Sequence, residues 1–283
     1  MKFNLLLALI LGLNLGTLVG CTPKTESEAV TPKEKQEIKI TGAGTPYTAL
    51  KALAKAYEEK EEGVKITFLP PSQSPGGIAG AQKGLVDLGS VTRKIKPEED
   101  DGSLEHRQLA QDGLVVATHP SVEGVTNLDT EQLKDIYSGK ITNWQEVGGP
   151  NATIVILDRP EDESAKKILR EYYLGEELET SSEAIILREE SDLIENVQAT
   201  EYSIGAFSLA NAISNDLPVN RLSLDGVEPT PENVKAGDYE MTRKLGIVYQ
   251  KEGTPEAASQ FIDFAFSEAG GEVLEELGFV PSE

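Results

Sequence analysis

Short apolar runs alternate with helical segments between residues 38 and 91, and this alternation constrains the fold more than any other feature of the sequence. Strands are predicted over residues 38–40, 64–69 and 86–91. Between them we predict one helix that opens at Thr45-Pro46, with Thr45 as its N-cap, and a shorter helix after Ser74. Strand–helix–strand alternation at this spacing is typical of a parallel α/β sheet.

The same alternation continues to the end of the chain. Further strands are predicted over residues 113–118, 152–157, 203–207 and 244–249. Further helices are predicted after Asp129 or Thr130, over residues 165–174, from Ser191, after Thr254-Pro255 and from Ser267. About 245 residues of this pattern exceed one typical core, so we expect two lobes with a ligand cleft between them. The lobes are predicted over residues 38–118 plus 225–283 and over residues 119–224.

The first residues are read as a leader and not as part of the fold. Lys2 precedes an apolar stretch over residues 3–19, which is typical of an export signal that ends at residue 20. Leu-Val-Gly-Cys at residues 18–21 resembles the lipobox of bacterial lipoproteins, which implies cleavage before Cys21 and lipidation of its thiol. The alternative is an ordinary signal peptide with a coincidental cysteine. Residues 21–37 would then form the lipidated cysteine and a polar tether.

Composition excludes several classes of protein. The chain has 26 Lys+Arg against 48 Asp+Glu, a net charge of −22, which argues against binding the phosphate backbone of nucleic acids. Beyond the leader no apolar run approaches the ~20 residues that cross a bilayer, which excludes an integral transporter. One cysteine and two histidines argue against a disulfide framework and a metal site, and we expect no cofactor.

Three strand-to-helix turns place a hydroxyl group or a charge at the start of a helix, at Thr45, at Ser74 and in residues 159–164. Helix N-termini expose unpaired N–H groups and a partial positive charge, so several that converge form an anion site. Arg159 would add a planar pair of donors. Two alternatives stay open. The hydroxyl residues only cap their own helices, or Arg159 is neutralised by its neighbouring acids, Asp158, Glu161, Asp162 and Glu163.

Nearly the whole mature chain resembles the phosphate-type solute-binding proteins of bacterial ABC importers. The segments that carry this resemblance are residues 42–45, 73–78, 87–90, 128–149, 203–206, 261–264 and 278–281. The resemblance implies a two-lobed periplasmic-binding-protein-like α/β fold that closes over an oxyanion. By position, Thr45, Ser74 and Arg159 would fall on ligand-binding sites of that family. We predict further ligand contacts from Gly76, Thr92, Glu163 and Ser164.

The sequence departs from that family at two places. Thr92 stands where the family usually has an aspartate that accepts a proton from bound phosphate, and residues 162–165 replace a Gly-Ser-Gly-Thr-like run. Glu163 would repel a dianion, or it would accept a hydrogen bond from a protonated oxyanion and so replace the missing aspartate; a third reading is a changed ligand. We expect an oxyanion, with phosphate favoured over arsenate and sulfate.

The function implied is extracytoplasmic capture of a small oxyanion for delivery to ABC permease subunits, by a monomer that a lipid holds to a membrane, in the periplasm or on the outer face of the cell membrane. No enzyme activity is expected, because no activated nucleophile is visible. The alternative is a ligand sensor or interaction protein that has kept the fold and lost transport.

Overall fold

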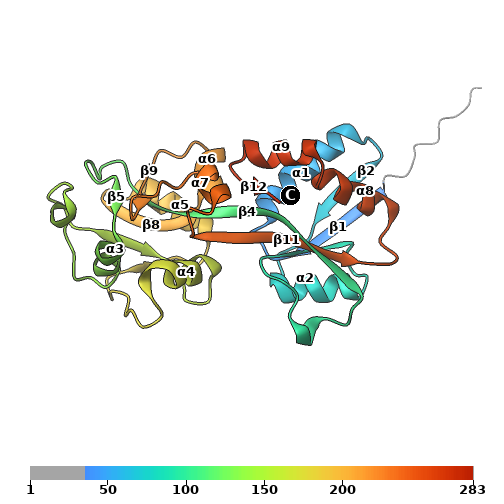
Figure 1. Cartoon of the computed structure of the whole chain (residues 1–283), viewed down its shortest axis with the longest axis horizontal. Coiled ribbons are helices and arrows are strands. Elements are labelled where there is room, and N and C mark those ends of the chain that lie inside the picture. The colour runs from blue at the N-terminus through green and yellow to red at the C-terminus, as the bar shows by residue number, and fades with distance from the viewer. Residues whose placement is uncertain (1–35, 283) are drawn as a thin grey trace, which may run out of the picture. The chain divides into compact units, whose positions relative to one another are not determined.

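The computed structural model describes residues 36–282, which form a mixed α/β fold around a ten-stranded sheet (Figure 1). The strands of this sheet are β1 (Gln36–Gly42), β2 (Val64–Phe68), β3 (Leu88–Val91), β4 (Leu104–Thr118), β6 (Val155–Asp158), β7 (Ile185–Ile186), β8 (Ser203–Ser208), β9 (Asn220–Arg221), β11 (Thr242–Gln250) and β12 (Val280–Pro281). The main path runs β2-β1-β3-β11-β4-β8-β6-β7, and β9 and β12 also pair with β4. A separate pair consists of β5 (Asn127–Leu128) and β10 (Ser223–Leu224).

The parallel sheet predicted from residues 38–91 is confirmed, whereas the middle of the path is antiparallel. Strand β1 pairs parallel with β2 and β3, and β6 pairs parallel with β7 and β8. Strand β11 instead runs antiparallel to both β3 and β4, and β4 runs antiparallel to β8. The local strand–helix pattern did not reveal this, because β11 comes from the far end of the chain to pair with β3 and β4.

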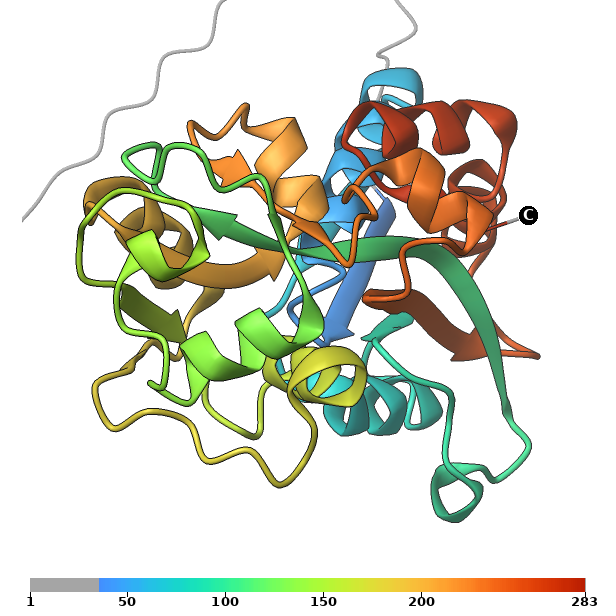
Figure 2. The same ribbon diagram turned by 60° about the vertical axis from the view of Figure 1, so that its left-hand side comes forward.

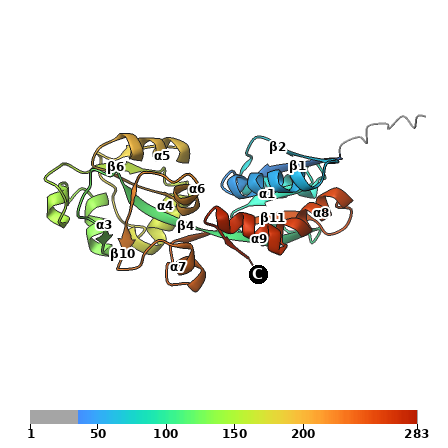
Figure 3. The ribbon, with the colours of Figure 1, turned by 90° about the horizontal axis from the view of Figure 1, so that it is seen from above.

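The helices form close to where the sequence predicts them. They are α1 (Tyr47–Lys60), α2 (Gln73–Gln82), α3 (Thr130–Tyr137), α4 (Ser164–Leu169), α5 (Glu190–Ala199), α6 (Leu209–Ser214), α7 (Pro231–Ala236), α8 (Glu256–Ala265) and α9 (Glu268–Glu276). The helix predicted over residues 165–174 is two elements, because after α4 the chain widens into a π-helical turn, Arg170–Leu174. Figure 3 shows α1, α8 and α9 gathered beside β1.

The predicted caps are partly confirmed. Asp129 and Ser267 accept hydrogen bonds from the first turns of α3 and α9. Thr45 is not the N-cap of α1, because the helix begins at Tyr47 and Pro46 takes the cap position without a side-chain bond. Ser74 lies inside the first turn of α2, whose cap position is Ser72. The hydroxyl groups of Thr45 and Ser74 are therefore not used for helix capping.

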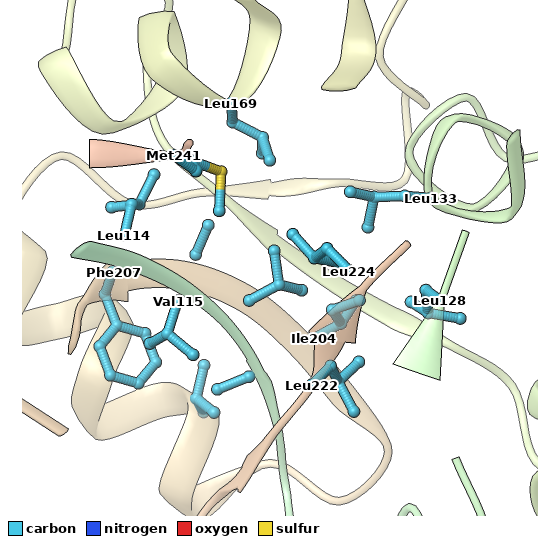
Figure 4. Packing of buried hydrophobic residues seen from close by; sticks show 14 of the residues in the cluster. Leu114, Val115, Leu128, Leu133, Leu169, Ile204, Phe207, Leu222, Leu224 and Met241 are labelled. Carbon is cyan, nitrogen blue, oxygen red and sulfur yellow. The ribbon is translucent and has the colours of Figure 1, made fainter. Parts of the chain in front are cut away.

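The described residues contain two large hydrophobic cores and a small third cluster that includes Ile78 and Ala81 of α2. The first core surrounds β1 and packs α1, α8 and α9 against the sheet. The second core lies around β6 and β8, and Figure 4 shows its packing, with Leu114, Ile204 and Phe207 among the labelled side chains. The long strand β4 belongs to both cores, and Figures 1 and 2 show it passing from one group of elements to the other.

The change from one core to the other occurs within a few residues. Along β4, Ala110 packs in the first core and Leu114 in the second. On the antiparallel partner, Met241 just before β11 packs in the second core and Leu245 in the first. The lobe boundaries near residues 118 and 225 stay a prediction.

The leader, Cys21 and most of the predicted tether lie outside the described residues. Strand β1 begins at Gln36, two residues before the predicted first strand, and the backbone of Gln36 pairs with Val64. Polar side chains do not prevent this pairing, since it is made by the main chain. From residue 36 to residue 282, none of the helices combines the length and the apolar character that crossing a membrane requires.

Candidate functional site

The first group of predicted site residues lies where β1 and β3 end. Gly42 closes β1 with φ 133°, and a side chain there would collide with the backbone of Ser90 in β3. The backbone N–H of Ser72 donates to the Gly42 carbonyl at 2.9 Å, which holds the start of α2 against the end of β1. Parallel neighbours therefore bring the starts of α1 and α2 to the same edge of the sheet.

Ser74 and Thr92 meet at this edge. The Thr92 N–H donates to Ser74 Oγ at 3.2 Å, and the two hydroxyl oxygens lie 3.5 Å apart. Ser74 is buried and Thr92 half-buried, and Gly76 follows in α2, where a Cβ would collide with the side chain of Ser72. Half-buried Thr45 lies just before α1, and within residues 36–282 its hydroxyl makes no hydrogen bond. This group supplies hydroxyl and N–H groups and no charge.

The second group follows the carboxyl end of β6. Asp158 ends this strand, accepts a hydrogen bond from the Arg159 N–H at 2.8 Å, and forms a buried ion pair with Lys166 of α4. Arg159 is only 7 % exposed although it is the first residue of a loop rich in acids. The turn between β6 and α4 thus holds a guanidinium inside the protein.

The acids of this loop are paired with other cations. Glu161 accepts two hydrogen bonds from Arg170, both at 2.6 Å, and these lower the pKa of Glu161. Asp162 accepts from Arg188 at 3.3 Å, which lowers the pKa of Asp162. Of the possible acids, only Glu163 forms an ion pair with Arg159 among the described residues. The alternative that neighbouring acids neutralise Arg159 is therefore confirmed for Glu163 alone. Asp158, Glu161 and Asp162 pair with other cations.

Arg159 keeps two donors free. Its Nη2 lies 3.3 Å from Glu163 Oε2, whereas Nε and Nη1 are buried without a hydrogen-bond partner in the part of the chain that the structure describes. A buried guanidinium N–H without an acceptor is costly, because water can no longer solvate it. Such donors are satisfied by a bound group with acceptor oxygens, which a tetrahedral oxyanion supplies.

Glu163 and Ser164 begin α4. Glu163 takes the N-cap position without a side-chain cap bond, and its second oxygen, Oε1, lies 3.5 Å from Arg188 Nη1. One carboxylate thus bridges two guanidinium groups. Ser164 is half-buried, and its hydroxyl makes no hydrogen bond to the rest of residues 36–282.

The structure brings Ser74 to Thr92 and Arg159 to Glu163, but within the described residues no hydrogen bond or ion pair joins the two groups. Both groups follow the carboxyl ends of parallel strands, and in Figure 1 α2 and α4 lie on the same side of β4 and β11. That all of these residues bind one ligand stays a prediction.

Sequence reasoning missed the buried ions behind this site. Asp112 of β4 and Arg243 of β11 pair at 2.8 Å, and Arg243 also contacts Glu190 at 3.2 Å. The local sequence gave little signal, because Asp112 and Arg243 each lie just outside a predicted apolar strand. By contrast, Lys166 was on the apolar face of a predicted helix.

No group of three or more His, Cys, Asp or Glu side chains in residues 36–282 is arranged to hold a metal ion. The family model of the PBP superfamily domain matches residues 27–269, and the chain belongs to this family. The fold is the two-lobed α/β fold of periplasmic binding proteins, as predicted.

The particular relatives are phosphate-binding proteins. The chain is 28 % identical over 250 residues to the phosphate-binding protein PstS of Borreliella burgdorferi, covering 86 % of this chain and 89 % of the relative. It is 27 % identical over 267 residues to PstS of Bacillus subtilis, covering 93 % and 87 %. A Clostridium perfringens structure with bound phosphate, described as a phosphate ABC transporter substrate-binding protein, is 31 % identical with a TM-score of 0.75 and covers 88 % of this chain and 100 % of that one.

Proposed function

We propose that this protein binds a small oxyanion, inorganic phosphate above others, and delivers it to the permease of an ABC importer. The observation that carries this proposal is the buried Arg159 guanidinium, whose Nε and Nη1 have no partner within the described residues. The names of the relatives at 27–31 % identity support phosphate as the ligand. They give no support to the alternative of a sensor that has lost transport.

The binding residues proposed are those that the sequence singled out. Arg159 supplies two charge-assisted hydrogen bonds from the second group, and Ser74, Thr92 and Thr45 supply neutral donors from the first. Gly76 keeps the start of α2 open to close approach, and Ser164 adds a hydroxyl at the start of α4. Closure of the two lobes around the crossover in β4 and β11 would bring both groups to one ligand.

The net charge of −22 is compatible with binding an anion. Donors within ~3 Å of a ligand dominate its binding energy, whereas surface charges beyond the ~8–10 Å Debye length are screened. Binding by fixed donors requires no bond to be made or broken, so we propose a binding protein and not an enzyme.

The proposed location is outside the cytoplasm, with the chain held to a membrane through lipidated Cys21 and acting as a monomer. The leader over residues 1–20 and the lipobox-like window at residues 18–21 support this part of the proposal. Two or three acyl chains contribute ~0.8 kcal/mol per buried CH₂ group, which makes such attachment durable.

The proposal is tested by titrating the protein, dialysed free of ligand, with inorganic phosphate in a calorimeter. Wild-type protein should bind one phosphate tightly. Arg159→Ala removes two charge-assisted hydrogen bonds, each contributing about 1.5–3 kcal/mol, so the affinity should fall by more than about 100-fold. Arg159→Lys keeps the charge and loses the fork, and should bind with intermediate affinity.

The matched control is Arg221→Ala, because Arg221 is an exposed arginine of β9 and its loss should leave the affinity unchanged. Unchanged affinity in Arg159→Ala would remove Arg159 from the site. Failure of the wild-type protein to bind phosphate, arsenate or sulfate would refute the proposed function.

A further inference from the structure

A buried network of charges lies where the two cores meet. Asp112 Oδ2 accepts from Arg243 Nε at 2.9 Å, and Asp112 Oδ1 accepts from the Ala210 N–H at 3.1 Å. Arg243 reaches Glu190 with Nη1 at 3.2 Å, and Asn211 Nδ2 donates to Glu190 Oε1 at 3.0 Å. The network therefore ties α5 and α6 to the two strands that both cores share.

The sheet order places Glu190 and Asn211 after the two strands that flank β6, the strand that Arg159 follows. Strand β6 lies between β7 and β8, and all three run parallel, so their carboxyl ends share one edge. Glu190 follows β7 and Asn211 follows β8, while Arg159 follows β6. The hydrogen bond between Glu190 and Asn211 therefore spans the end of β6, from which Arg159 projects.

The charges of this network are unbalanced without Arg159. Two carboxylates, Asp112 and Glu190, share the single guanidinium of Arg243. Burial alone would raise the pKa of Glu190, but the charges of Arg243 and Arg159 and the bonds from Arg243 and Asn211 outweigh burial, and the pKa is lowered. Glu190 is thus held as a carboxylate whose charge Arg159 helps to balance.

Glu190 attracts Arg159 without occupying its donors. The ion pair of Arg159 is formed with Glu163 through Nη2, and no hydrogen bond joins Arg159 to Glu190 among residues 36–282. A carboxylate that bonded Nε and Nη1 directly would compete with an incoming anion. A charge held at a greater distance by Arg243 and Asn211 orients the guanidinium and leaves both nitrogens free.

We propose that Glu190, fixed by Arg243 and Asn211, is a positioning residue that holds the Arg159 guanidinium in the orientation that receives the anion. The inference rests on the proposed function for its binding readout. It assigns Glu190 no contact with the ligand.

The sign of the effect of Glu190→Gln tests this role. By Coulomb's law alone, removing a negative charge near the site should tighten the binding of inorganic phosphate. Loss of a positioning residue should instead raise the Kd by about tenfold. Interaction energies between residues of one hydrogen-bond or salt-bridge network correspond to changes in Kd of about this size. Glu195→Gln, on an exposed position of the same helix, is the matched control and should leave the Kd unchanged.

Two further measurements separate positioning from a general loss of stability. Asn211→Ala removes a bond that holds Glu190 but no charge, and it should raise the Kd in the same direction by a smaller factor. The NMR signal of the Arg159 Nε–H, assigned with Arg159→Lys, should shift in phosphate-free Glu190→Gln and stay in place in Glu195→Gln.

Each outcome decides one question. An unshifted Nε–H signal, or binding of phosphate by Glu190→Gln that is as tight as or tighter than wild type, overturns the positioning role. A wild-type protein that binds no phosphate refutes the proposed function, whereas the Nε–H shift in ligand-free protein still supports or overturns the role of Glu190. If Glu190→Gln does not fold, Asn211→Ala tests the role of Glu190 by the same two readouts.

Discussion

The choice between oxyanions is made by single residues, and Glu163 is the carboxylate closest to the free guanidinium. Its Oε2 lies 3.3 Å from Arg159 Nη2, and its side chain is 29 % exposed. A carboxylate at this place accepts a hydrogen bond from an oxyanion that carries a proton and repels one that carries none. Near neutral pH phosphate retains a proton and sulfate does not, so Glu163 should favour phosphate.

Glu163→Gln should therefore reduce the preference for phosphate over sulfate, by about tenfold or more, mainly because sulfate binds more tightly. Competition calorimetry with both anions measures the ratio. Asp162→Asn is the matched control, since it removes the same charge from the neighbouring, more exposed residue. Equal changes in the two variants would mean that only the net charge of the loop matters and that Glu163 is not the acceptor.

The residues of the proposed site that lie in a local motif could be predicted from the sequence, whereas residues that are joined across the fold could not. Arg159 could be predicted because it follows a strand and precedes a helix, and the structure places it in that turn. Which acid pairs with Arg159 could not be predicted, because the arginines that neutralise the other acids are distant in the sequence. Arg170 lies 9 residues from Glu161, and Arg188 lies 26 residues from Asp162. Glu190 and Arg243 are 53 residues apart, and only the folded sheet joins them.

Among the secondary-structure elements, β6 and α4 hold the loop that carries Arg159, because a buried ion pair joins them. Lys166 of α4, fully buried, pairs with Asp158 at the end of β6 and donates to Thr180 Oγ1 at 3.2 Å. Its ammonium group also lies 5.4 Å from the ring centre of Tyr137. A short helix of six residues, α4, gains its fixed position from this pair more than from its own backbone bonds.

Lys166→Met should destabilise the protein strongly, because it leaves Asp158 buried without a counter-charge. Breaking a buried pair in this way costs about 3–5 kcal/mol, which corresponds to a fall in Tm of about 10 °C for a chain of this size. Lys167→Met, the exposed neighbour, should change the Tm by less than about 2 °C. Thermal unfolding followed by circular dichroism compares the two, and a small effect at both positions would show that the pair does not fix the loop.

The elements themselves could largely be predicted from the sequence, and so could the parallel direction of β1, β2 and β3. The antiparallel direction of β11 could not be predicted. Strands such as β1 and β6 follow from short apolar runs, and α3 follows from its cap at Asp129 and its buried stripe. The antiparallel pairing of β11 with β4 joins residues more than 120 positions apart, for example Arg243 with Asp112. Local periodicity carries no information on such pairings.

At the scale of the whole molecule, acid should weaken the fold through carboxylates that are ionised by their partners. The guanidinium of Arg93 donates to both oxygens of Glu99, at 2.6 and 2.7 Å, and lowers the pKa of Glu99 to about 2. Bonds from Arg170 and Arg188 lower the pKa values of Glu161 and Asp162. Asp112 has the opposite effect on the dependence of stability on pH, because burial raises its pKa.

A folded pKa below the unfolded value means that the unfolded chain binds the proton first as the pH falls. The stabilisation from Glu99, Glu161 and Asp162 is therefore complete above their ordinary values, 4.5 for Glu and 3.8 for Asp, and is lost as the pH falls toward the lowered values. Denaturant unfolding between about pH 6 and pH 3 should show a free energy that falls below about pH 4.5. Glu99→Gln removes one of these groups, so the slope with pH should be shallower in this variant, and an identical slope would show that the Arg93 pair does not contribute to the acid sensitivity.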